Sequence, residues 1–95
     1  MTLEVRDHPA ALQYEVTVDG EQAGVLRYTL DGDVVTLMHT EVEPKYEGHG
    51  VAAELVRGAL DDLRSRGKKI VPLCEYVLAY LERHDEYRDL VQLEQ

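Results

Sequence analysis

The sequence of 95 residues contains one cysteine, few basic residues and no long apolar run. One cysteine excludes an intramolecular disulfide framework and is typical of a reducing compartment, so we expect a cytoplasmic protein. No group of cysteines and histidines has the spacing of a zinc site, and we expect no metal. No segment has the length of a membrane span, and no charged-then-apolar signal segment follows Met1, so no membrane partner is expected.

Positive charge is scarce: ten Lys and Arg residues are outnumbered by 19 Asp and Glu residues, which gives a formal net charge of −9 at pH 7. This balance excludes a nucleic-acid partner, because binding to phosphate backbones needs a basic face. An anionic small ligand needs a locally positive place, which helix N-termini and a few lysines can supply. The length predicts a single domain over residues 1–95, and the composition is that of a globular protein.

In the first half of the chain, apolar and polar residues alternate in short segments that are separated by turn signals. The alternation predicts half-buried strands, and Asp-Gly pairs at 19–20 and 31–32 mark the turns between them. Together these segments predict an antiparallel meander. The predicted strands cover residues 3–6, 12–18, 24–30 and 34–42.

In the second half, apolar residues recur at helical spacing from Val51 to Leu63, with charged residues opposite them and Gly67 as a C-terminal cap. A short strand is predicted over 69–74 and a second helix over 75–83. A strand–helix–strand unit predicts parallel pairing with a right-handed crossover. The predicted class is therefore α/β of the α+β type, a mixed sheet with an antiparallel meander, a β-α-β parallel pair and a C-terminal helix.

The segment EGHGVA, residues 47–52, places two glycines directly in front of the long predicted helix. Glycines at this position either form a tight turn or bring bare backbone to an anion at the helix N-terminus. The residue types alone leave both interpretations open. Ligands favour junctions where strand ends part and a helix N-terminus points into the gap, and this segment lies at such a junction.

With this order of elements, the sequence resembles the very small single-domain members of the GNAT (GCN5-related) N-acetyltransferase superfamily. The superfamily pattern Gln/Arg-x-x-Gly-x-Gly/Ala is matched by 47–52 in its last four positions, and the stretches HTEV, VPLC and YVLAYLERHDEY add to the likeness. The resemblance implies that acetyl-CoA is the acetyl donor. It implies that backbone in the glycine segment holds the pyrophosphate, while strand backbone pairs with the pantetheine amides. The implied donor-binding residues are Glu41, Val42, Glu47, Gly48, His49, Gly50, Val51 and Ala52.

The sequence departs from the family pattern in two ways. Glu47 stands where Gln or Arg is usual, which places negative charge near the implied phosphates, and Lys45 is a candidate to compensate it. Full-size members have helices between their first two strands that shape the acceptor site, but here only a few residues around Pro9 separate those strands. The acceptor amine, a small molecule or a protein, therefore stays open, as does the choice between monomer and homodimer.

Three side chains are candidates for chemistry. Cys74 matches a proposed acetyl acceptor of the resembling small proteins, although a lone cysteine is by residue type a small buried apolar residue. Strict alternation places His39 on the face of Val35 and Leu37, across from the strand that bears Cys74, where it can take a proton from a thiol or an amine. Tyr80 matches the tyrosine that protonates the CoA thiolate in larger members. Packing is the alternative role for His39 and Tyr80.

The sequence thus predicts an N-acetyltransferase that passes an acetyl group from acetyl-CoA to an amine, directly or through an acetyl-cysteine intermediate at Cys74. One alternative is a CoA-binding module without turnover, which the missing acceptor helices favour. The other is a protein-interaction domain that kept only the fold. Binding of acetyl-CoA and turnover of its thioester distinguish the three.

Overall fold

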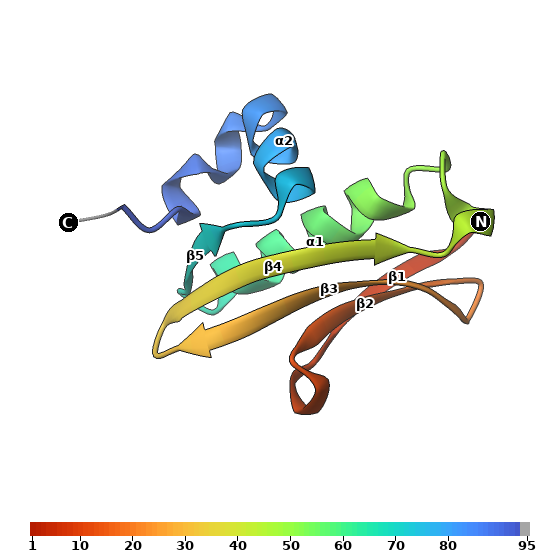
Figure 1. Ribbon diagram of the computed structural model, residues 1–95, viewed down its shortest axis with the longest axis horizontal. Helices are drawn as coiled ribbons and strands as arrows, with labels where there is room; N and C mark the ends of the chain where they lie inside the picture. The colour runs from red at the N-terminus through yellow and green to blue at the C-terminus, as the bar shows by residue number, and fades with distance from the viewer. Residues whose placement is uncertain (94–95) are drawn as a thin grey trace.

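The computed structural model describes residues 1–93, in which five strands form one sheet. The spatial order of the strands is their chain order, antiparallel from β1 to β4 and parallel between β4 and β5 (Figure 1). This is the predicted mixed sheet, with the meander followed by a β-α-β unit, so the fold class is confirmed. The strands are β1 (Leu3–His8), β2 (Gln13–Val18), β3 (Glu21–Asp31), β4 (Val34–Val42) and β5 (Lys69–Pro72).

Two α-helices complete the fold. The crossover helix α1 (Val51–Ser65) runs along one face of the sheet, and α2 (Glu75–Arg83) follows β5 (Figure 1). After α2, a 3-10 helix over Asp85–Leu90 leads to Val91, which forms a parallel bridge with Ile70 of β5. None of the helices within residues 1–93 has the length and apolar character needed to cross a membrane.

The predicted strand over 69–74 was too long. Pairing with β4 stops at Pro72, which lies opposite Leu37. The next two residues, Leu73 and Cys74, both donate their backbone N–H groups to the carbonyl oxygen of Leu37, each at 3.0 Å. The chain therefore leaves the sheet after Pro72, and Cys74 becomes the N-cap residue of α2.

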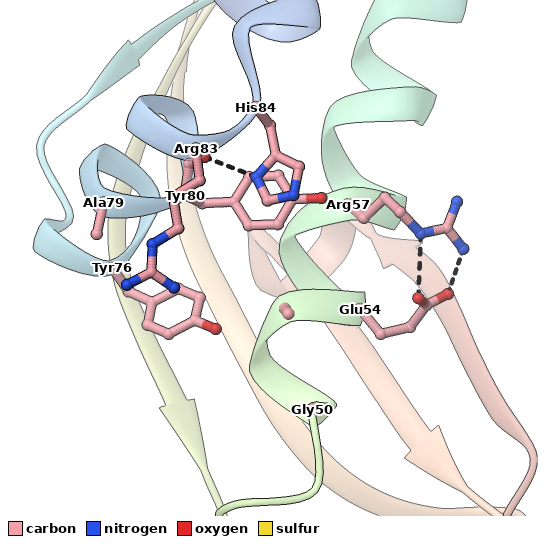
Figure 2. Close-up of a pocket in the computed structure, with 9 residues that line it drawn as sticks. Gly50, Glu54, Arg57, Tyr76, Ala79, Tyr80, Arg83 and His84 are labelled. Atoms are coloured by element: carbon pink, nitrogen blue, oxygen red, sulfur yellow. Dashed lines mark hydrogen bonds and ion pairs between the residues drawn. The ribbon is translucent and has the colours of Figure 1, made fainter.

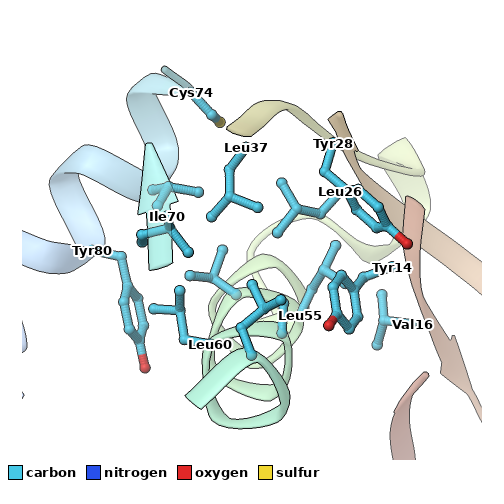
Figure 3. Close-up of a cluster of buried hydrophobic side chains, with 14 of the residues drawn as sticks. Tyr14, Val16, Leu26, Tyr28, Leu37, Leu55, Leu60, Ile70, Cys74 and Tyr80 are labelled. Atoms are coloured by element: carbon cyan, nitrogen blue, oxygen red, sulfur yellow. The ribbon is translucent and has the colours of Figure 1, made fainter. Parts of the chain in front are cut away.

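The hydrophobic core fills the space between the sheet and α1 (Figure 3). The buried positions on α1 recur every three or four residues, and those on β2 recur every second residue, so each element presents one apolar face to the other. Side chains with less than 2% exposure include Tyr14, Val16, Leu26, Leu37, Leu55, Leu60 and Ile70.

Gly58 allows α1 to pack closely against β1. A Cβ atom at this position would lie 2.7 Å from the Cβ of Val5 and 2.9 Å from each of its Cγ atoms. We expect Gly58→Ala to lower the free energy of unfolding by about 1 to 3 kcal/mol through overpacking, even though alanine favours helix over glycine by about 1 kcal/mol. Urea unfolding followed by circular dichroism measures this change.

The matched variant for this test is Val5→Ala combined with Gly58→Ala. Val5→Ala alone costs stability because it removes apolar contacts, but in the double variant it also removes the overlap. We expect the double variant to be more stable than the two single effects added together. A Gly58→Ala protein as stable as the wild type would show that β1 and α1 separate easily.

Candidate functional site

The chain between β4 and α1 turns through two glycines in the left-handed region. Gly48 has φ 83° and Gly50 has φ 77°, a backbone conformation that other residues rarely adopt. A Cβ atom added at either glycine would meet no atom within 4 Å, so both face open space. The turn therefore requires glycine for its conformation and leaves its outer side accessible to a ligand.

Among the described residues, the backbone N–H groups at this turn have no acceptor in good hydrogen-bond geometry. Gly50 is the N-cap residue of α1 and makes no side-chain cap, and the first helical bond runs from the N–H of Glu54 to the carbonyl of Gly50 at 3.1 Å. Within residues 1–93, the N–H groups from Gly48 to Ala52 donate to no backbone or side-chain atom. Together with the positive end of the helix dipole, such groups form a binding place for an anion.

A cleft of about 480 Å³ lies in front of this turn. On one side it is bounded by the end of β4, which continues past Leu37 without a strand partner on the β5 side among the described residues. That edge of β4 offers main-chain donors and acceptors to an extended ligand. The residues that line the cleft are Thr40, Val42, Tyr46, Glu47, Gly48, Gly50, Val51, Ala52 and Tyr76.

A β-bulge on β4 decides which side chains of this strand face α1. Tyr28 of β3 lies opposite Leu37, whereas the preceding residue, Arg27, lies opposite His39. Met38 is therefore an extra residue in β4 with no partner of its own. Such an insertion reverses the alternation of side chains for the rest of the strand.

The bulge shows that the expected position of His39 is wrong. Beyond it, Thr40 lies opposite the fully buried Leu26 and faces the core, while His39 projects from the other face of the sheet. There its Nε2 atom lies 3.1 Å from a carboxylate oxygen of Glu41, and both side chains are more than half exposed. His39 does not share a face with Cys74.

Thr40 takes the place that strict alternation gave to His39. The Cys74 side chain is 7% exposed, and its Sγ atom lies 3.2 Å from the Thr40 Oγ1 atom. Because Thr40 also lines the cleft, the thiol lies one side chain away from it. Sequence reasoning missed Thr40. Only knowledge of the bulge at Met38 would have pointed to it, and the hydrophobic pattern of the sequence does not show that bulge.

These features can be compared with those of known proteins. Residues 13–90 match the family model described as GCN5-related N-acetyl-transferase. The chain belongs to this family. It is also 34% identical over 74 residues to Protein NATD1 of Mus musculus and of Gallus gallus, and each alignment covers 76% of this chain and 67% of the relative.

Solved structures of the GCN5-related family have the same fold. A GCN5-like protein from Staphylococcus aureus superposes with a TM-score of 0.70 at 20% identity, over 97% of this chain and 90% of that one. The ribosomal-protein-S18-alanine N-acetyltransferase from Escherichia coli gives a TM-score of 0.65 at 22% identity, over 81% of this chain and 53% of that one. At these identities the comparison concerns the fold alone, and it agrees with the fold that the sequence predicted.

In this member of the family, Tyr80 does not line the cleft in front of the glycine turn, and its role as the acid that protonates the CoA thiolate stays a prediction. Its ring stacks on that of His84 with centroids 3.9 Å apart, and its hydroxyl points away from Cys74 (Figure 3). Burial raises the pKa of the Tyr80 phenol. The α2 tyrosine that lines the cleft is Tyr76, one helical turn earlier and 41% exposed.

Lys45, the candidate to compensate the charge of Glu47, pairs with a different carboxylate. The Lys45 Nζ atom lies 3.0 Å from a carboxylate oxygen of Glu21, which also accepts a hydrogen bond from the Tyr46 hydroxyl. The hydrogen bond from Lys45 to Glu21 raises the pKa of Lys45. Lys45 therefore does not pair with Glu47, which lines the cleft. Among residues 1–93, no group of three or more His, Cys, Asp and Glu side chains is arranged to hold a metal ion.

Proposed function

We propose that this protein is an N-acetyltransferase that takes the acetyl group of acetyl-CoA and passes it to an amine. The observation that carries the proposal is the glycine turn, with backbone N–H groups that have no well-placed acceptor among residues 1–93 and lie at an open cleft before a helix N-terminus. Membership of the GCN5-related family supports the same activity.

The residues around the cleft fit the donor substrate. The N–H groups of residues 48–52 would hold the pyrophosphate, and the absence of a Cβ atom at Gly48 and Gly50 lets the backbone approach it. The unpaired edge of β4 at Glu41 and Val42 would take the pantetheine amides. Glu47, at the rim, contributes backbone; its carboxylate opposes the phosphates and lowers the affinity.

For the transfer itself, we propose a first step onto Cys74. Acetyl-CoA supplies an acetyl group activated as a thioester. The Cys74 Sγ atom forms a bond to the acetyl carbon while the bond from that carbon to the CoA sulfur breaks, and the thiol proton leaves with the CoA thiol. The Thr40 hydroxyl, 3.2 Å from Sγ, orients the thiol. The acceptor amine then takes the acetyl group and loses a proton, which restores the Cys74 thiol.

The test combines binding with turnover. Calorimetry with acetyl-CoA and CoA measures donor binding, and thiol release from acetyl-CoA in the presence of primary amines and lysine-containing peptides measures transfer. We expect both. Binding without thiol release for every amine would favour the CoA-binding module instead, and no binding of either ligand would contradict the proposal.

A further inference from the structure

A second hollow adjoins the cleft and shares Gly50 and Tyr76 with it. This hollow, of about 380 Å³, lies between α1 and α2 (Figure 2). The remaining residues that line it are Ala53, Glu54, Arg57, Ala79, Tyr80, Arg83 and His84.

The two arginines of this hollow differ in their partners. Arg57 lies 2.6 Å from Glu54 and 3.3 Å from Asp61, and Figure 2 shows its guanidinium turned to Glu54. Arg83 forms no ion pair or hydrogen bond with any residue in the described part of the chain, although the net charge of the protein is −9. The only other Lys or Arg side chain without either among residues 1–93 is Arg27, on β3. Arg83 is therefore the positive charge in the hollow that remains available to an anion.

The chemistry of the donor relates this hollow to the glycine turn. CoA extends in two directions from its pyrophosphate: the pantetheine arm carries the thioester, and the other arm carries a ribose with a 3′-phosphate and adenine. If pantetheine follows β4 and the pyrophosphate lies at the turn, the second arm leaves the turn at Gly50, where the hollow between α1 and α2 begins.

We infer that Arg83 binds the 3′-phosphate of the donor and makes the protein select CoA over dephospho-CoA. The inference rests on the proposed function. A guanidinium suits this task because its planar set of donors can pair with two phosphate oxygens at once. Arg83 belongs to α2, so this contact would also bring α2 into donor recognition, together with the turn before α1.

The experiment compares CoA with dephospho-CoA, which lacks only the 3′-phosphate, by calorimetry at low salt. We expect the wild type to bind CoA about tenfold more tightly, a difference of about 1.4 kcal/mol. Arg83→Gln should lose this preference through weaker CoA binding while its affinity for dephospho-CoA stays unchanged. Arg83→Lys should keep part of it, and added salt should reduce the preference of the wild type.

Arg88→Gln is the matched control, because it removes the same charge nearby from an arginine that pairs with Asp85 at 2.9 Å and lies outside the hollow. It should keep the wild-type preference. A preference for CoA that survives in Arg83→Gln, or an equal loss of affinity for CoA and for dephospho-CoA, would overturn the inference. If the wild type binds neither ligand, the proposed function fails, and that result differs from failure of the inference alone.

Discussion

Gly50→Val is expected to reduce acetyl-CoA binding at least about a hundredfold. A branched side chain at this position would project into the open space outside the turn, where the pyrophosphate is proposed to lie. Two hydrogen bonds to a charged group, each worth about 1.5 to 3 kcal/mol, would then be lost, and about 2.8 kcal/mol already corresponds to a hundredfold. Calorimetry measures the affinity, and the rise in melting temperature with added acetyl-CoA gives an independent readout.

Gly67→Val is the control for this prediction. Gly67 follows the other end of α1, has φ 71° and, like Gly50, faces open space. Both variants place a branched residue in the left-handed region and should lower the melting temperature of the free protein by similar amounts. Only Gly50→Val should lose the stabilisation by acetyl-CoA. A folded Gly50→Val protein that keeps the wild-type affinity would exclude the proposed pyrophosphate site.

The second large effect concerns the thiol. Incubation with acetyl-CoA and no acceptor should leave one acetyl group on the protein, on the peptide that contains Cys74. Cys74→Ala should lose this adduct completely and keep its affinity for CoA, because the glycine turn that is proposed to hold the phosphates lies elsewhere on the chain. Intact-protein mass spectrometry and peptide mapping measure the adduct, and calorimetry measures the affinity.

Gly50→Val again supplies the control, since it keeps Cys74 and Thr40 but cannot place the donor. If the adduct requires the bound donor, this variant should remain unmodified at the same concentration of acetyl-CoA. An adduct of equal amount in Gly50→Val would mean that acetylation occurs directly from solution. Turnover with amines in the wild type, but with no adduct, would reject the covalent step and leave direct transfer.

Much of the fold could be predicted because its signals are local. The bounds of β4 and α2 agree with the predicted 34–42 and 75–83. Pro44 ends the strand pattern, and the residues of the second segment alternate between apolar and charged with the period of a helix. The position of the glycine turn also followed from the sequence, because two glycines before an amphipathic helix determine both a turn and a helix start.

The side-chain positions in the site could not be predicted in the same way. Alternation assumes an unbroken register. The prediction therefore did not include the inserted residue Met38, and it put His39 in the place that Thr40 occupies. The partner of Lys45 is Glu21, the first residue of β3, whereas Lys45 lies in the turn after β4, so this pairing depends on how the two segments meet in space. That Arg83 has no ion-pair partner among residues 1–93 likewise becomes visible only once the carboxylates of this part of the chain have been placed in space.

The strand order also bears on how the molecule folds. Because spatial order equals chain order, β1 to β4 are joined by short connections and form contacts that are close in sequence. The pairing of β5 with β4 is different, since α1 lies between these strands in the sequence and must first cross back over the sheet. Pairings distant in sequence form more slowly than local ones. We therefore expect the cleft, which needs both the end of β4 and the start of α2, to be completed late in folding, after the meander that supports it.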